Sequence, residues 1–382
     1  MKTIRLTLAL ILIACITISR AQGTWSQKAY FGGVERSNAV GFSIGDKGYI
    51  GTGSDQSDFW EYDPLSDSWT QKADFGGGNR SSAVGFAIGS KGYVGTGYSS
   101  SDFWEFDPVA NTWLQKADFA GGGRDNAIGF CIGNKGYLGT GINWDEDWWG
   151  LSDFWEYDPA TNLWTKKASF GGGGRYNAVG FSIGNMGYVG MGYYYSVSKG
   201  DFWQYNPVTD QWINKASLDY RYRAIGFSIG DKGYCGLGFD QEGSNELFDF
   251  NEYDPLTNSW TELAAYEGAG SIDAVGFSIG NKGYIGTGIN PDGWTGTSDF
   301  WEYSLENCGN GLTVFADADN DSYGDAANSL NVADCVVPSG YVDNSTDCDD
   351  ASSEINPGVS EIFNGIDDNC NGIIDDIVCN AP

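Results

Sequence analysis

One sequence pattern occurs six times between residues 24 and 304 of this chain. Its best preserved form reads Arg-x-x-Ala-Val-Gly-Phe-Ser-Ile-Gly, Lys-Gly-Tyr-Ile-Gly-Thr-Gly, Asp-Phe-Trp-Glu-Tyr-Asp-Pro and Trp-Thr-x-Lys-Ala. The alanine of the first segment recurs every 44 to 51 residues, at Ala39, Ala83, Ala127, Ala178, Ala224 and Ala274. A period of this length is typical of propeller blades and of solenoid turns.

Each copy contains four short segments with the composition of β-strands. In the first copy they are residues 39–44, 48–51, 59–62 and 69–73, and they are separated by Gly or Asp-Pro. β-branched and aromatic residues favour strands, whereas Gly, Asp and Pro favour turns. Helical spacing of apolar residues is absent from residue 22 onward, so an all-β fold is expected. Four strands in each of six copies predict a six-bladed β-propeller.

The two ends of the repeat region predict how the propeller closes. The sixth copy stops at Tyr303 without a Trp-x-x-Lys-Ala strand, and that strand stands instead at residues 25–29. The first strand is therefore expected to complete the last blade. Pairing the ends removes an open sheet edge, and it defines a propeller domain over residues 22–304.

The repeat resembles the Kelch family, in which an Arg precedes the innermost strand, a Tyr and a glycine pair mark the second, Tyr-Asp-Pro the third and Trp the fourth. The matching positions of the first copy are Arg36, Tyr49, Gly51, Gly53, Tyr62, Asp63, Pro64 and Trp69. One departure is consistent, since Gly-Thr-Gly replaces the usual Gly-Gly. The resemblance implies a Kelch-type propeller, a scaffold that hosts many unrelated functions.

The composition excludes several functional classes. The formal net charge is -30, which argues against nucleic acid as a partner. The chain contains no histidine, so the commonest general base and zinc ligand is missing. A propeller that resembles galactose oxidase would need histidine among its copper ligands.

Residues 1–21 have the three parts of an export signal: Lys2 and Arg5, an apolar run over residues 6–18, and small residues before a cleavage site after Ala21. The apolar run is too short for a transmembrane helix. Residues 12–15, Leu-Ile-Ala-Cys, also resemble a lipobox, which would leave a lipid anchor on Cys15. We favour cleavage after Ala21. Both routes export the protein, so a secreted, periplasmic or cell-surface location is expected.

Residues 305–382 are predicted to form a second, loop-rich module. From Cys308 onward this segment contains 15 Asp and Glu and no Lys or Arg, so it supplies half of the net charge. Five cysteines lie in it, whereas Cys131 and Cys235 of the propeller replace small or aliphatic repeat residues and are expected to be core thiols. A compact segment with this charge repels itself unless cations bind.

Two loops of the module have the ligand spacing of an EF-hand loop, with oxygen donors at positions 1, 3, 5 and 9 and a backbone carbonyl at position 7. The predicted ligands are Asp317, Asp319, Asp321, Tyr323 and Asp325 in the first loop, and Asp367, Asn369, Asn371, Ile373 and Asp375 in the second. Hard oxygen donors suit calcium better than a transition metal. The terminal bidentate glutamate is missing from both loops, so modest affinity or a ligand from another segment is expected. The candidate segment is Asp347-Cys348-Asp349-Asp350, followed by Glu354 and Glu361.

Residues 317–376 resemble the metal-binding motif of the MopE type, a module found at the ends of exported bacterial proteins. The acidic residues between the two loops that fit this motif are Asp347, Asp349, Asp350, Glu354 and Glu361. The family's Cys-Asp is replaced here by Phe363-Asn364, and a disulfide between Cys335 and Cys348 is the preferred first pair. The family is associated with copper, but calcium fits better because histidine is absent and no methionine follows Met191.

The loops between the second and third strands of each copy are expected to lie on one face and to carry recognition. They lengthen in the later copies, over residues 142–152, 193–200, 239–248 and 289–298. Their candidate ligand-binding aromatics are Trp144, Trp148, Trp149, Tyr194 and Trp294. Aromatic side chains beside carboxylates suit sugar faces and equally a protein hot spot. The alternative is that these rings only cover adjoining blades.

A ring of arginines is expected on the same face, and its members are Arg36, Arg80, Arg124, Arg175 and Arg221. Ser271 replaces the arginine in the sixth copy. Five guanidinium groups around one channel mouth would bind an anion. Each arginine could instead pair with the Asp that opens the third strand, the favoured interpretation, because crowded unpaired charges are costly.

These patterns favour an exported, non-catalytic recognition or adhesion protein, whose propeller binds a protein or glycan outside the cell and whose C-terminal module binds calcium. The alternative is an exported carbohydrate-active enzyme that uses loop carboxylates such as Asp145, Glu146 and Asp147. No hydrolase signature accompanies these carboxylates, so binding is the preferred function.

Overall fold

The computed structural model describes residues 23–374 except 146–148, 241–244, 291–294, 306–311, 333–336, 339, 343, 360 and 363. The predicted export signal, including Cys15, lies outside the described residues, as do Glu146, Asp147, Trp148, Trp294, Cys308, Cys335, Asp375 and Cys379. Every regular element in the described part of the chain is a β-strand. The all-β prediction is therefore confirmed.

Six four-stranded antiparallel sheets, called blades below, lie in the described part of residues 24–304. The first contains β2 (Val40–Ile44), β3 (Lys47–Gly51), β4 (Phe59–Asp63) and β5 (Ser68–Lys72); the second β6 (Val84–Ile88), β7 (Lys91–Gly95), β8 (Phe103–Asp107) and β9 (Thr112–Gln115); the third β10 (Ile128–Ile132), β11 (Lys135–Gly139), β12 (Phe154–Asp158) and β13 (Leu163–Lys167).

The fourth blade contains β14 (Val179–Ile183), β15 (Met186–Gly190), β18 (Phe202–Asn206) and β19 (Gln211–Lys215); the fifth β20 (Ile225–Ile229), β21 (Lys232–Gly236), β22 (Phe250–Asp254) and β23 (Ser259–Glu262); the sixth β24 (Val275–Ile279), β25 (Lys282–Gly286), β28 (Phe300–Ser304) and β1 (Thr24–Gln27). Two later loops form small hairpins, β16 (Tyr193–Tyr194) with β17 (Val197–Ser198) and β26 (Ile289–Asn290) with β27 (Thr295–Gly296).

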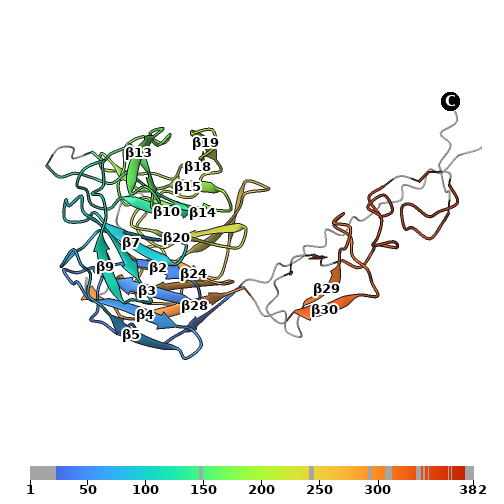
Figure 1. Ribbon diagram of the computed structural model, residues 1–382, viewed down its shortest axis with the longest axis horizontal. Helices are drawn as coiled ribbons and strands as arrows, with labels where there is room; N and C mark the ends of the chain where they lie inside the picture. Colours follow the sequence, from blue (N-terminus) through green and yellow to red (C-terminus); the bar gives the residue numbers. More distant parts are fainter. Residues whose placement is uncertain are drawn as a thin grey trace, which may run out of the picture.

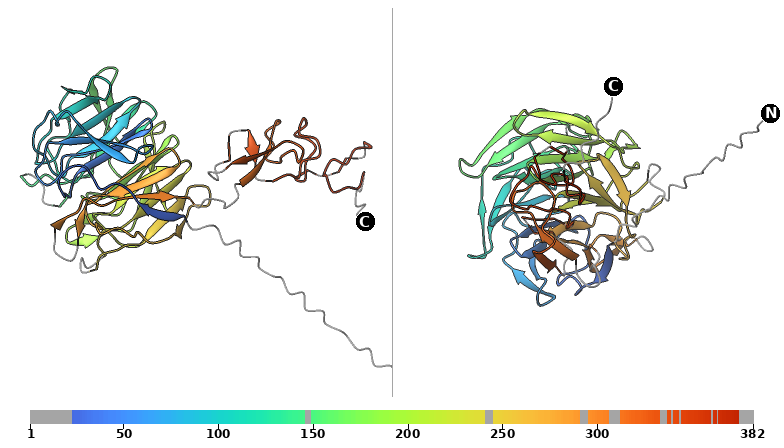
Figure 2. Two further views of the ribbon diagram at one scale, coloured as in Figure 1. Left: turned by 90° about the horizontal axis from the view of Figure 1, so that it is seen from below. Right: turned by 90° about the vertical axis from the view of Figure 1, so that its right-hand side faces the viewer.

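The blades form a closed ring in which the first strand of each copy lies innermost. Neighbouring inner strands β2, β6, β10, β14, β20 and β24 contact one another in chain order, and β24 contacts β2. Figure 2 shows the blades arranged around this axis in its right-hand view. The fold is a β-propeller.

Strand β1 closes the ring as the sequence predicts. It pairs antiparallel with β28, with Trp25 opposite Tyr303. Trp25 is only 8% exposed, and its ring packs against Phe250, Tyr266 and Tyr303 at centroid distances of 5.0, 5.2 and 5.0 Å. The residue that begins the propeller is thus buried between its fifth and sixth blades.

Repeated aromatic residues fill the spaces between blades. Phe59 of the first blade lies 4.9 Å from Phe106 and 5.0 Å from Trp113 of the second, measured between ring centroids. The repeated glycine of the second strand admits a neighbour's ring, because a Cβ on Gly48 would lie 2.6 Å from the ring of Phe277. The repeated residues therefore maintain the scaffold.

The C-terminal module lies apart from the blades in Figure 1. It contains a three-stranded sheet of β29 (Leu312–Ala316), β30 (Ser329–Val332) and β31 (Tyr341–Val342), followed by loops. A disulfide joins Cys348 to Cys370, so the predicted pairing of Cys348 with Cys335 is wrong. The preference for Cys335 rested on the need of a small acidic module without a core for disulfides, and the Cys348–Cys370 pair meets that need instead.

Cys131 and Cys235 are free thiols. Cys235 is fully buried and Cys131 half-buried, and burial raises the pKa of Cys131 to about 11 and that of Cys235 to about 12. Neither thiol is activated at neutral pH. No helix in the described residues is long and apolar enough to cross a membrane.

Candidate metal centre and propeller face

The first acidic loop folds back on its own carboxylates. The backbone N–H of Asp321 donates to Asp317 Oδ1 at 3.1 Å and to Asp319 Oδ1 at 3.2 Å. Ser322 N–H donates to Asp317 Oδ2, and Tyr323 N–H donates to Asp321 Oδ1. These bonds turn the carboxylates at positions 1, 3 and 5 inward, as the sequence spacing predicts.

The second loop has the same internal hydrogen bonds. Asn371 N–H donates to Asp367 Oδ1 and to Asn369 Oδ1, both at 3.1 Å, and Gly372 N–H donates to Asp367 Oδ2 at 2.8 Å. Position 4 has a positive φ in both loops, 63° at Asn320 and 54° at Cys370. Two segments 50 residues apart in the sequence therefore share one loop conformation.

A third segment completes the first loop. Asp347 N–H donates to the carbonyl of Gly324, and Ala318 N–H donates to Asp350 Oδ1 at 2.9 Å, so residues 344–350 lie across the loop. Carboxylate oxygens of Asp317, Asp319 and Asp321 lie within 4.8 Å of one another, and so do those of Asp319, Asp347 and Asp350. Asp319 belongs to both groups. We call these five aspartates the carboxylate cluster.

The carboxylate cluster has unused bonding capacity. Oδ2 of Asp319, Asp321 and Asp347 is buried and makes no hydrogen bond. Asp347 and Asp317 are each only 9% exposed. Burial, and then repulsion by neighbouring carboxylates, raises the pKa of Asp319; burial together with the same repulsion raises that of Asp347. Because the module contains no Lys or Arg, a bound cation is the direct way to stabilise these groups.

The donor chemistry favours a hard cation. All five cluster residues offer carboxylate oxygens, which suit calcium or magnesium. The two sulfur atoms within residues 347–376 are joined in the Cys348–Cys370 disulfide, so neither is a thiolate ligand. The residues present fit an oxygen-coordinated ion and do not supply the nitrogen or sulfur ligands that favour copper.

Other predicted ligands lie outside the carboxylate cluster. Asp325 accepts a bond from Ala327 N–H, Asp349 and Glu354 are exposed, and Glu361 Oε1 accepts a bond from Asn369 N–H in the second loop. Tyr323 and Ile373 hold the predicted seventh positions of their loops. The second loop gathers Asp367, Asn369 and Asn371 without a further carboxylate group among the described residues.

Sequence reasoning missed the role of Asp368. This residue is only 4% exposed and accepts bonds from Ile362 N–H and from the Asn364 amide. Its backbone carbonyl accepts a bond from Asn356 N–H. Asp368 therefore organises the backbone beside the second loop. Nothing in the spacing distinguishes it from its neighbour Asp367.

The arginine ring is not an anion site. The five arginines are at most 4% exposed, and each pairs with the Asp that precedes the third strand of its own copy: Arg36 with Asp58, Arg80 with Asp102, Arg124 with Asp153, Arg175 with Asp201 and Arg221 with Asp249. Arg124 also donates to the carbonyl of Thr140. The hypothesis that these arginines bind a ligand is therefore wrong, because their guanidinium groups are buried in ion pairs, as the favoured interpretation predicts.

The later loops bring exposed aromatics together. Trp144 is 40% exposed, Trp149 49% and Tyr194 38%. Trp149 lies 4.1 Å from Tyr195 between ring centroids, and Lys199 Nζ lies 5.6 Å from the Tyr194 ring. Trp149 and Tyr194 line a pocket of about 350 Å³ together with Lys166 and Asp153. Asp145 is exposed in the same loop as Trp144.

Comparisons with known proteins find a match for each of the two parts of the chain. Residues 347–376 match the family model Cu-binding_MopE, described as "Putative metal-binding motif". The matched range contains Asp347 and Asp350 of the carboxylate cluster but not the first loop. No curated protein sequence matches the chain.

A solved structure titled "Structure of YjhT" is similar to the propeller. Its TM-score is 0.63 at 17% sequence identity, and the similarity covers 71% of this chain and 95% of that one. At this identity the similarity shows the fold alone, a β-propeller.

Proposed function

We propose that this protein is an exported, non-catalytic recognition protein whose C-terminal module binds calcium. One observation carries the calcium proposal: three buried carboxylate oxygens, on Asp319, Asp321 and Asp347, lack hydrogen bonds within a single cluster. A divalent cation at this position would supply the missing partner for each oxygen. The match of residues 347–376 to a metal-binding motif independently supports metal binding by this module.

Calcium is preferred to magnesium because the cluster is assembled from separate loops. Calcium accepts six to eight oxygens in flexible geometry, whereas magnesium demands a regular octahedron and retains its waters. The ion would fasten residues 344–350 to the first loop and so rigidify a module without a large core. Without the terminal glutamate of an EF-hand loop, the expected Kd is that of extracellular modules, about 0.1 to 1 mM.

The propeller supplies the recognition surface in this proposal, for a protein or a glycan outside the cell. Exposed aromatics on long loops of a rigid scaffold support it. The Cys348–Cys370 disulfide is consistent with export, because disulfides persist in oxidising compartments.

Calorimetry on the purified full chain tests the metal proposal. After chelation, we expect binding of calcium in the 0.1 to 1 mM range and at least a tenfold loss of affinity in D319N/D347N. The exposed Asp349→Asn is the matched control, since it removes one charge from the same segment outside the cluster. Absence of heat at millimolar calcium, or equal affinity in D319N/D347N, would refute the proposal. Tighter copper binding that survives D319N/D347N would assign the module to a different ion and site.

A further inference from the structure

Six residues form a polar ring where the chain enters the innermost strands. Each immediately precedes the alanine of the repeat, and together they are Asn38, Ser82, Asn126, Asn177, Arg223 and Asp273. All six have a positive φ, between 51° and 58°. The N–H of each donates to the carbonyl of the residue in the preceding blade at 3.0 to 3.3 Å, so the ring is closed by backbone bonds. The ring closure therefore does not depend on the side chains of these residues.

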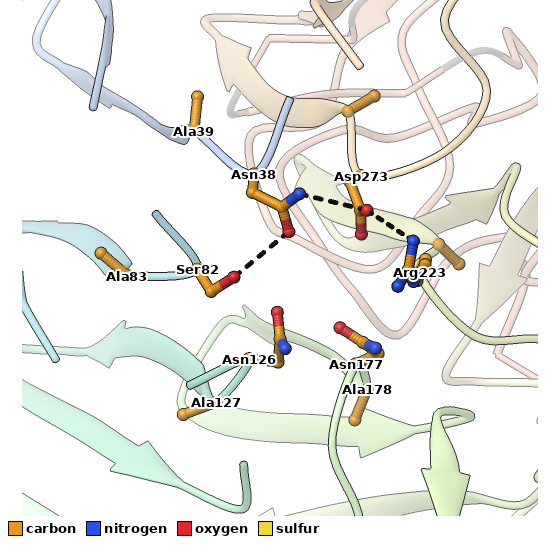
Figure 3. A pocket seen from close by; sticks show the side chains of 12 residues that line it. Asn38, Ala39, Ser82, Ala83, Asn126, Ala127, Asn177, Ala178, Arg223 and Asp273 are labelled. Carbon is orange, nitrogen blue, oxygen red and sulfur yellow. Dashed lines mark hydrogen bonds and ion pairs between the residues drawn. The ribbon is translucent and has the colours of Figure 1, made fainter. Parts of the chain in front are cut away.

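These side chains surround a pocket of about 150 Å³ on the propeller axis, called the axial cup below. Figure 3 shows them converging from all six blades. A cavity of this volume holds about six heavy atoms, so only one edge of a larger ligand would enter it. The cup is lined by polar groups above a ring of alanines, so it suits a hydrogen-bonding ligand.

The cup has both donors and acceptors available. Asp273 Oδ2 accepts bonds from Arg223 Nη1 at 3.1 Å and from Asn38 Nδ2 at 3.2 Å, and the Asp273 side chain is only 6% exposed. Arg223 makes this one side-chain bond, and its buried Nε makes none. The amides of Asn126 and Asn177 make no side-chain hydrogen bond to any described residue, and each can donate and accept.

A row of aromatic rings lies in the loops of the third to fifth blades. Trp144, Tyr176, Tyr193, Tyr222 and Phe239 follow one another at centroid distances of 6.0, 5.7, 4.7 and 5.5 Å. Tyr176 and Tyr222 immediately precede Asn177 and Arg223, whereas serines precede Asn38 and Ser82. Two members of the aromatic row are therefore sequence neighbours of residues that line the cup.

We propose that the axial cup binds a neutral, hydroxyl-rich ligand, a single sugar residue that is either free or the end of a glycan. Side-chain amides match hydroxyls, which both donate and accept, and the half-buried rings of Tyr176 and Tyr222 would offer faces for the C–H side of a sugar ring. An anion would meet the Asp273 carboxylate in a chain of net charge -30, and a cation would meet Arg223. This proposal rests on the recognition role of the propeller and does not depend on the metal.

Saturation-transfer NMR on the full chain tests the proposal with methyl glycosides of neutral hexoses and N-acetylhexosamines. We expect transfer to at least one glycoside in the wild type, unchanged by EDTA, and at least a tenfold loss of affinity in N126G/N177G. Glycine removes both amides while tolerating the positive φ at both positions. The control is Asp55→Gly, which removes an exposed polar side chain at a φ of 62° in the first blade. Thermal unfolding establishes that each variant is folded.

The outcomes separate the ligand's source and class. Transfer to monosaccharides assigns a free sugar, whereas binding seen only on a glycan array, and lost in N126G/N177G, assigns a chain end. Absence of both, equal binding in N126G/N177G, or transfer only to an acidic glycoside such as methyl glucuronide overturns the proposal. Calcium binding that persists when sugar binding is absent would leave the metal proposal intact.

Discussion

The backbone N–H of Asn38 donates to the carbonyl of Asp273 at 3.1 Å, although 235 residues separate them in the chain. This bond joins the first and sixth blades beside the axis. The pairing of β1 with β28 joins the same two ends of the chain within the sixth blade. The ring is therefore closed both near the axis and at its rim, and it is expected to unfold as one cooperative unit.

Replacing Trp25 should weaken the closure. Trp25 is buried against three aromatic rings, and its indole N–H donates to the carbonyl of Ala264. We expect Trp25→Ala to lower the free energy of unfolding by about 3 to 5 kcal/mol, since it leaves a cavity and an unpaired carbonyl. Urea unfolding followed by tryptophan fluorescence measures the change. Leu114→Ala, on the exposed outer strand β9, is the control and should change little.

The buried Arg–Asp pairs should make the stability of the propeller depend on pH in the acidic range. Burial alone would raise the pKa of Asp153, but hydrogen bonds and charge from Arg124 and a bond from the Trp155 indole outweigh it and lower this pKa. The pair's contribution is therefore fully present above about pH 4 and is lost as pH falls below that value. We expect thermal unfolding temperatures to fall steeply between pH 4 and pH 2.

Arg124→Gln isolates one such pair. We expect this substitution to lower the free energy of unfolding by about 3 to 5 kcal/mol at pH 7, because the half-buried Asp153 loses its cation. The loss should shrink as pH falls below about 4, because protonation of Asp153 removes the charge with which Arg124 pairs. A cost that is independent of pH would show that Arg124 acts through packing on Phe119 rather than through charge.

The repeated positions made the scaffold predictable. The period, the strand chemistry and the displaced Trp25 strand predicted the all-β fold and its closure, since each rests on local composition or on a missing copy. Residues outside the repeated pattern gave weaker predictions of the site. The spacing of Asp317, Asp319 and Asp321 indicated one loop, and its missing glutamate indicated a ligand from another segment, with residues 347–350 as the candidate. Only the fold shows that Asp347 and Asp350 reach this loop while Asp349 stays exposed.

The axial cup could not be predicted from local sequence either. Asn38 and Asp273 occupy equivalent places in the repeat, yet only the closed ring brings them to one pocket. The arginines were equally ambiguous, because a ring of five cations and a set of five buried ion pairs have the same sequence pattern. Burial decided between them, and burial depends on the whole fold.

The Cys348–Cys370 disulfide should stabilise the module. It closes a segment of 22 residues, so its removal is expected to cost about 3 kcal/mol through the entropy of the unfolded chain. C348S and C370S should lose similar free energies of unfolding. A dithiol reducing agent should destabilise the wild type to the same extent. Peptide mapping without reduction checks the pairing directly; a Cys335–Cys348 peptide would contradict it.

The two loops differ at their sixth position in a way that predicts a gain of affinity. Ser322 holds a φ of 78°, a region that favours glycine, and the second loop has Gly372 there at 87°. Ser322→Gly keeps the N–H that donates to Asp317 Oδ2 and removes the strain of a side chain, which is about 1 kcal/mol. Since that strain opposes the ligand-bound loop, we expect calcium affinity to rise about fivefold in calorimetry. The reciprocal Gly372→Ser should introduce strain without altering the carboxylate cluster, so it should leave calcium binding at the first loop unchanged while lowering the stability of the module. If Ser322→Gly weakens calcium binding, the Ser322 side chain is itself part of the site, and the position-by-position equivalence of the two loops fails.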